Sequence, residues 1–190
     1  MQFLSLGKSI VNSLILYHCI QNFLTSLLTN NLKYMAITVG QKAPNFELPD
    51  ENKNIVKLES LKGKNVVLLF FPAAFTSTCT KEMCQTRDEL SYFNGMNAEV
   101  FGISVDMPFT LAKYKADNQL NFPLLSDFNK EAITAYGCKY DTWVAGLKGV
   151  AKRSSFVIDK EGVIRFAQIL EVAGDYPDFD GIKKTLEGLK

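Results

Sequence analysis

Histidine and closely paired cysteines are scarce in this chain of 190 residues. The only histidine is His18, and the four cysteines, at positions 19, 79, 84 and 138, do not form the closely spaced pairs of a zinc site. Four cysteines are also too few, in a chain of this length, for a secreted disulfide scaffold. The sequence therefore predicts no metal site, and it favours a reducing compartment, the cytoplasm.

An excess of charge of either sign is lacking as well. The chain has 21 basic and 20 acidic residues, which gives a formal net charge of +1. The densest basic group after the first 34 residues is Lys148, Lys152 and Arg153, and no basic cluster is interleaved with aromatic side chains. Nucleic-acid binding is therefore not expected. The composition is that of an ordinary globular protein, in which one domain can bury a full core.

Residues 1–34 differ from the rest of the chain. Apart from His18, residues 9–32 contain no acidic or basic side chain, but polar residues interrupt the apolar ones too often for a confident membrane span. The segment has no arginine and no convincing cleavage site. We expect an N-terminal extension that is disordered, weakly helical or an upstream translation before a physiological start at Met35; a signal or an anchor remains an alternative. No stable membrane association is expected, and residues 35–190 are expected to form the folded domain.

After Met35 the pattern alternates between strands and helices. Continuous apolar runs, typical of strands buried on both faces, predict strands at residues 66–71 and 99–105. Further strands are predicted at 46–48, 55–58, 123–125, 155–158 and 163–170, and helices at 77–93, 109–119, 130–136 and 178–189. Parallel strands with helical crossovers, followed by an antiparallel hairpin with its loop at 159–162, predict an α/β fold with a mixed central sheet flanked by helices. This layout is compatible with a thioredoxin-like fold.

The predicted helix at 77–93 follows a buried strand and has one apolar face. That face carries Cys79, Met83, Thr86, Leu90 and Phe93 at helical spacing. Gly95 is expected to cap the end of this helix.

Cys79 lies near the start of this helix, where a cysteine can become reactive. The first backbone N–H groups of a helix lack partners, and together with the helix dipole they favour a thiolate. The opposing interpretation is an inert, buried small hydrophobe, which is how free cysteines commonly behave. The position by itself does not decide between the two.

Three residues around this position match a family signature. Pro72, Thr76 and Cys79 fit the pattern Pro-x-x-x-Thr-x-x-Cys, and Arg153 opens a later predicted strand in the right chain order. Segments 39–46 and 153–159 extend the similarity, which covers roughly residues 37–189. The chain resembles the peroxiredoxins, the alkyl hydroperoxide reductase and thiol-specific antioxidant family. It is most similar to their bacterioferritin comigratory protein and AhpE-like branch.

The resemblance implies a thioredoxin-like fold and a role for each residue of the site. Cys79 would be the peroxidatic cysteine, which attacks the peroxide as a thiolate and becomes a sulfenic acid. Thr76 would hydrogen-bond the thiolate or the peroxide, and Arg153 would stabilise the charge that develops in the transition state. Pro72 would shield the sulfenic acid, and Glu82 resembles the residue that orients the arginine in one branch of the family.

Each of these residues also has a purely structural interpretation. Thr76 could act only as a helix N-cap, and the two roles can coexist. Arg153 could be a surface residue beside Lys152, and Pro72 could simply end a strand, since proline cannot donate to the ladder. The joint occurrence of the residues favours chemistry over these separate explanations.

Cys84 is the candidate resolving thiol, because the resemblance implies that role for a cysteine at this offset. On one helix, residues five positions apart lie on different faces, with Cα atoms more than about 7 Å apart, so a disulfide with Cys79 needs the helix to unwind. Alternatives are a bystander Cys84 with an external thiol completing the cycle, or resolution by Cys138, which we interpret as structural. Cys19 lies in the extension.

The sequence thus predicts a thiol-dependent peroxidase that reduces hydrogen peroxide and organic hydroperoxides and needs no cofactor. A thioredoxin or a similar dithiol donor would reduce the disulfide, and a homodimer is left open. A thiol-disulfide oxidoreductase on the same fold is disfavoured, because a Cys-x-x-Cys pair is missing. A non-enzymatic redox sensor is the alternative from another class, and repeated turnover would distinguish it from an enzyme.

Overall fold

The computed structural model describes residues 37–189. Its strands are β1 (Glu47–Pro49), β2 (Ile55–Lys57), β3 (Asn65–Phe70), β4 (Ala98–Ser104), β5 (Leu124–Ser126), β6 (Ser154–Ile158) and β7 (Ile164–Ile169). Its α-helices are α2 (Ser77–Asp88), α3 (Leu90–Gly95), α4 (Pro108–Asp117), α5 (Glu131–Ala135) and α6 (Phe179–Glu187), and 3₁₀ helices lie at Leu58–Leu61 and Val144–Gly146. Within this described part, no helix has the length and apolar composition needed to cross a membrane.

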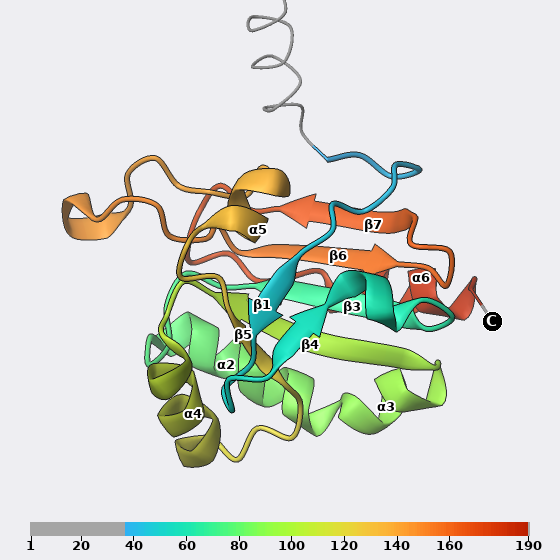
Figure 1. Cartoon of the computed structure of the whole chain (residues 1–190), viewed down its shortest axis with the longest axis horizontal. Helices are drawn as coiled ribbons and strands as arrows, with labels where there is room; N and C mark the ends of the chain where they lie inside the picture. Colours follow the sequence, from blue (N-terminus) through green and yellow to red (C-terminus); the bar gives the residue numbers. More distant parts are fainter. Residues whose placement is uncertain (1–36, 190) are drawn as a thin grey trace, which may run out of the picture. The chain divides into compact units, whose positions relative to one another are not determined.

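Five strands form a mixed sheet in the order β5-β4-β3-β6-β7 (Figure 1). The central strand β3 is parallel to β4 and antiparallel to β6. Of the two outer strands, β5 is parallel to β4, and β7 is antiparallel to β6. Because β6 runs against β3, its first residue, Ser154, lies opposite Phe70 at the end of β3. This register places Arg153, directly before β6, beside the C-terminal end of β3, where the chain continues toward Cys79. The short strands β1 and β2 pair separately as an antiparallel hairpin.

The side chains of β3 alternate between two hydrophobic cores, as the pleat of a strand requires. Val66, Leu68 and Phe70 contribute to the core that includes residues of β1 and α5. Val67 and Leu69, together with Phe71 directly after the strand, contribute to the other core, which includes Cys79 and residues of α2, α3, α4 and α6. Both faces of β3 are therefore covered, which explains the continuous apolar run in the sequence.

The predicted elements agree with the structure to within two residues at almost every boundary, and the α/β fold with a mixed sheet is confirmed. The prediction of one helix at 77–93 is wrong, because the helix is interrupted at Glu89. At this point Asn121 Nδ2 donates a hydrogen bond to the Arg87 carbonyl from outside the helix, at 3.3 Å. Gly95 is also not a cap: it is the last residue of α3, and the left-handed backbone that follows belongs to Asn97, with φ 51°. The predicted extension, with His18 and Cys19, lies outside the described residues and stays a prediction.

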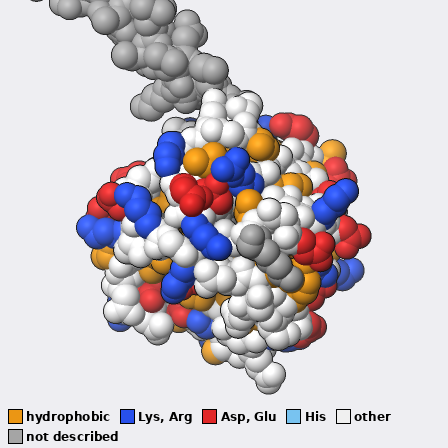
Figure 2. Space-filling model, turned by 90° about the vertical axis from the view of Figure 1, so that its right-hand side faces the viewer, with side chains coloured by type: hydrophobic (Ala, Val, Ile, Leu, Met, Phe, Trp, Pro, Cys, Tyr) orange, Lys and Arg blue, Asp and Glu red, His pale blue; other side chains and the backbone are white. Residues whose placement is uncertain are grey.

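A cavity of about 260 Å³ lies at the end of the sheet opposite Arg153. It is lined by Val66 at the start of β3, by Ile158 at the end of β6 and by lysine and acidic side chains around them. Figure 2 views the molecule from this end and shows basic, acidic and hydrophobic side chains interspersed on its surface. This face therefore has no extended patch of one charge sign.

Gly102 in β4 is required by the close packing of α2 on the sheet. A Cβ atom at this position would lie 2.7 Å from Leu124 Cδ2 and 3.0 Å from Met83 Sδ. We expect Gly102→Ala to lower the free energy of unfolding by about 1–3 kcal/mol, as overpacked core variants do. Urea denaturation followed by circular dichroism measures this change.

Gly95→Ala is the matched control, because a Cβ atom there has nothing within 4 Å. Since alanine is favoured over glycine in a helix, this variant should be as stable as the wild type or slightly more stable. Equal stability of the two variants would contradict the packing described for Gly102.

Candidate active site

The loop between β3 and α2 is held in place by the neighbouring parallel strand. Pro72 is buried at the start of this loop, so its place is compatible with both ending the strand and shielding the sulfur. The Ala74 N–H donates to Asp106 Oδ2 at 2.8 Å, and the same oxygen accepts from the Ser104 hydroxyl at 2.9 Å. The next residue, Phe75, has a left-handed backbone with φ 62°, which is unfavourable for a side chain of this size. The Asp106 carboxylate therefore fixes a strained turn just before the helix.

Thr76 occupies the N-cap position of α2, but its side chain does not cap the helix. Its hydroxyl donates to the Ala73 carbonyl at 2.9 Å, and it accepts no hydrogen bond from the first turn. The N–H groups of that turn, which lack partners within the helix, are thus left for another acceptor near Cys79. The N-cap interpretation of Thr76 holds for its position and not for its hydroxyl.

Cys79 is the third residue of α2, and its side chain is 1% exposed. Arg153 Nη2 lies 3.4 Å from Cys79 Sγ, so the guanidinium points a donor at the sulfur. The same nitrogen donates to the Ala173 carbonyl at 3.1 Å, in the loop between β7 and α6. The helix N-terminus and the guanidinium both favour negative charge on the sulfur. Arg153 is not the surface residue of the structural interpretation, because it is buried.

Glu82 and Arg153 form a buried ion pair, with side chains that are 0% and 1% exposed. Burial raises the pKa of the Glu82 carboxyl to about 7, and Arg153 opposes part of this rise. For Arg153 itself, burial alone would lower the pKa, but Glu82 and Cys79 raise it above its usual value. The raised pKa of Glu82 favours a neutral carboxyl, and the raised pKa of Arg153 favours a charged guanidinium. Since arginine stays protonated in proteins, we assign the titration near neutral pH to Glu82.

Cys84 lies on α2 together with Cys79 and is half-buried. Its sulfur is 4.0 Å from Asn118 Oδ1, which is consistent with a weak S–H hydrogen bond. Five residues of helix separate two Cα atoms by more than about 7 Å, beyond the reach of a disulfide. The helix therefore has to unwind locally before the two sulfurs can meet.

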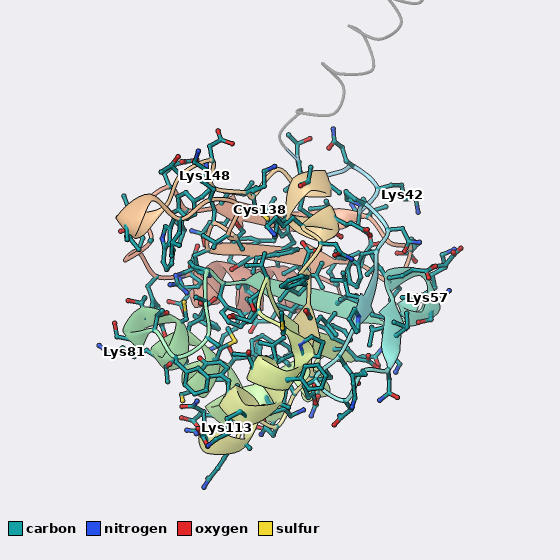
Figure 3. All side chains as sticks on the ribbon, turned by 60° about the vertical axis from the view of Figure 1, so that its left-hand side comes forward. Lys42, Lys57, Lys81, Lys113, Cys138 and Lys148 are labelled. Carbon is teal, nitrogen blue, oxygen red and sulfur yellow. The ribbon has the colours of Figure 1, made fainter. Side chains whose placement is uncertain are left out.

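Cys138 lies in the other hydrophobic core, away from Cys79. Figure 3 labels it near α5, on the far side of the sheet from the helix α2 that carries Lys81. Burial raises the pKa of its thiol to about 12, so it stays protonated at neutral pH. This environment is typical of a structural cysteine and unfavourable for a resolving one.

Several contacts of the site were not predicted from the sequence. Tyr114 of α4 donates its hydroxyl to Thr80 Oγ1 at 3.2 Å and packs edge-on against Phe75. Asp106 and the Ala173 carbonyl belong to loops without a periodic pattern. Only Asp106 left a signal, because it follows a strand parallel to β3, and the carboxyl ends of parallel strands share one edge of the sheet. In residues 37–189, no group of three or more His, Cys, Asp or Glu side chains could hold a metal ion.

Comparisons with known proteins agree with this geometry. The model of the AhpC/TSA family matches residues 39–167. A putative peroxiredoxin of Mycobacterium tuberculosis is 43% identical over 138 residues, which cover 72% of this chain and 87% of the relative. Alkyl hydroperoxide reductase E of the same organism is 40% identical over 136 residues, which cover 70% of this chain and 86% of the relative.

Among solved structures, peroxidoxin BcpB from Mycobacterium tuberculosis superposes with a TM-score of 0.72 at 32% identity, covering 81% of this chain and 99% of that one. The chain belongs to the AhpC/TSA family, the peroxiredoxins. It is a thiol-dependent peroxidase with the thioredoxin-like fold of that family.

The Glu82–Arg153 pair can be tested with Glu82→Gln, which keeps the shape and removes the charge. Because a hydrogen bond to a charged group contributes about 1.5–3 kcal/mol, we expect the second-order rate of Cys79 oxidation by peroxide to fall about 10- to 150-fold. Stopped-flow mixing at pH 8 measures this rate. Since the Glu82 pKa is raised to about 7, the carboxyl is charged only above that pH, and the ratio of wild-type to variant rates should shrink from pH 8 to pH 6.

Glu171→Gln is the matched control, because Glu171 pairs with Lys152 beside the site but is 75% exposed. Exposed ion pairs contribute little, so this variant should react within about twofold of the wild type. A pH-independent ratio for Glu82→Gln, or equal rates for the two variants, would contradict the role given to Glu82.

Proposed function

We propose that the protein reduces hydrogen peroxide and organic hydroperoxides with Cys79 as the peroxidatic cysteine. The observation that carries this proposal is the 3.4 Å contact between Arg153 Nη2 and Cys79 Sγ at the start of α2. The thiolate attacks the terminal peroxide oxygen, an S–O bond forms and the O–O bond breaks. The departing oxygen takes up a proton and leaves as water or alcohol, and Cys79 remains as a sulfenic acid.

The neighbouring residues support each stage of this step. Arg153 donates toward the sulfur and stabilises the charge that moves onto the peroxide oxygens. Glu82 holds the guanidinium in position. The Thr76 hydroxyl, three residues before Cys79, is proposed to hydrogen-bond the peroxide. Pro72, buried at the start of the loop before Cys79, is proposed to shield the sulfenic acid from further oxidation.

Cys84 is the proposed resolving thiol. It lies on the same helix as Cys79 and is more accessible than Cys138. The Cys84 thiol would displace the sulfenic oxygen as water, and the resulting Cys79–Cys84 disulfide would be reduced by a thioredoxin or a similar dithiol donor. The described cysteines are free thiols, which is consistent with a reducing compartment such as the cytoplasm.

Peroxide consumption by cysteine variants of the full chain tests this function. We expect Cys79→Ser to abolish turnover with a thioredoxin system, because no other described cysteine has the same surroundings. Cys84→Ser should still react with one equivalent of peroxide but accumulate Cys79 sulfenic acid, which dimedone labelling and mass spectrometry detect. Peptide mapping distinguishes these products from any at Cys19.

The outcomes separate the parts of the proposal. Turnover that persists in Cys79→Ser would refute the peroxidatic role. A single oxidation without turnover in the wild type would favour the redox sensor. Normal turnover of Cys84→Ser by the same dithiol donor would mean that an external thiol resolves the sulfenic acid.

A further inference from the structure

The loop between β7 and α6 contacts both parts of the active site. Its Ala173 carbonyl accepts a hydrogen bond from Arg153 Nη2 at 3.1 Å. Three residues later, the Tyr176 hydroxyl donates to Gln85 Oε1 on α2 at 2.8 Å. One short loop therefore touches the guanidinium that faces Cys79 and the helix that carries both reactive cysteines.

Gln85 borders the part of α2 that has to rearrange. It follows Cys84 directly, and the segment from Cys79 to Cys84 must lose its helical form before the two sulfurs can bond. The Gln85 amide also donates to Glu89 Oε1 at 3.1 Å, where α2 is interrupted, so its orientation is fixed. The hydrogen bond from Tyr176 to this side chain thus ties the C-terminal end of the moving segment to a neighbouring loop.

Tyr176 is well placed to hold this segment without locking it. Its ring packs against Phe179 at the start of α6, with ring centroids 5.9 Å apart, and the following Pro177 is buried. The tyrosine is nevertheless 40% exposed, so water can replace its hydrogen bond when the helix opens. A hydrogen bond of this kind changes a conformational equilibrium by about 2- to 10-fold.

We propose that Tyr176 is a positioning residue that latches α2 in the closed form and thereby sets the rate at which Cys84 reaches oxidised Cys79. The inference rests on the proposed function and on Cys84 as the resolving thiol. In the gated step the Cys84 sulfur attacks the sulfenic sulfur of Cys79, the S–S bond forms and the S–O bond breaks. The hydroxyl leaves with the Cys84 proton as water, so the sulfenic sulfur is reduced and Cys84 is oxidised.

The Tyr176–Gln85 hydrogen bond also affects how the protein tolerates excess peroxide. While α2 stays closed, the sulfenic acid remains beside Arg153, where a second peroxide can oxidise it to sulfinic acid. Opening of the helix removes Cys79 from that position. Because the Tyr176–Gln85 hydrogen bond keeps the helix closed, it slows disulfide formation and favours overoxidation of Cys79.

Tyr176→Phe tests the latch, because it removes the hydroxyl and keeps the ring that packs on Phe179. Tyr92→Phe is the matched control: its hydroxyl donates to Glu187 Oε1 on α6 at 3.0 Å and does not touch α2. The full-length proteins are mixed with one equivalent of hydrogen peroxide and quenched with an alkylating agent after millisecond delays. Mass spectrometry then quantifies Cys79 sulfenic acid, Cys79 sulfinic acid and the Cys79–Cys84 disulfide.

We expect Tyr176→Phe to form the disulfide about 3- to 10-fold faster than the wild type, while Tyr92→Phe stays within twofold. At high peroxide the sulfinic fraction of Tyr176→Phe should fall accordingly. Removal of the acceptor by Gln85→Ala should also accelerate the step. The double variant should gain no more than the faster single variant, because both single variants remove the same Tyr176–Gln85 hydrogen bond.

Two results overturn the inference in different ways. Equal rates of disulfide formation in the wild type, Tyr176→Phe and Tyr92→Phe refute the latch alone and leave the peroxidase function intact. Absence of a Cys79–Cys84 disulfide in the wild type refutes Cys84 as the resolving thiol and the latch with it. Only loss of the dependence on Cys79 would refute the proposed function itself.

Discussion

Arg153 and Glu82 pair inside the protein, where neither side chain reaches solvent. Removing one partner of such a pair costs about 3–5 kcal/mol, because the other charge is left buried and uncompensated. The guanidinium uses its fork of donors to reach Glu82 with one nitrogen and both Cys79 and the Ala173 carbonyl with the other. One side chain thus joins β6, α2 and the loop before α6 around the reactive sulfur.

The same pair constrains how the helix can move. Glu82 lies between Cys79 and Cys84, so unwinding this segment pulls on the carboxylate that holds Arg153. Opposing this, the start of α2 is weakly held: Thr76 gives it no side-chain cap, and Phe75 before it has an unfavourable backbone. The helix therefore depends on tertiary contacts, from Arg153 on one side and Tyr176 on the other, more than on its own termini. A site of this kind can close around the peroxide and still open for the disulfide.

The sequence predicted the elements well where local patterns determine them. The continuous apolar run of β3 and the hairpin before β7 reflect burial and turn chemistry that are local in the chain. The interruption of α2 at Glu89 was not predictable in this way, because it coincides with a hydrogen bond from Asn121, far away in the sequence.

The active site also combines residues that lie far apart in the sequence, and local patterns could not bring these together. Cys79 and Arg153 could be paired only through the resemblance to a family, since 74 positions separate them. Tyr176 and Ala173 act from a loop without periodicity, and the Ala173 contact uses a backbone carbonyl that no side-chain pattern could reveal.

The reaction of Cys79 with peroxide depends, in this site, on the fork of donors that Arg153 presents to the sulfur. The rate of Cys79 oxidation by peroxide in Arg153→Lys, measured by stopped-flow mixing, tests this most directly, because lysine keeps the charge and loses the planar donor geometry. We expect the rate to fall by about 100-fold, comparable to the loss of a charged hydrogen bond. A lysine variant that reacts within about threefold of the wild type would contradict it.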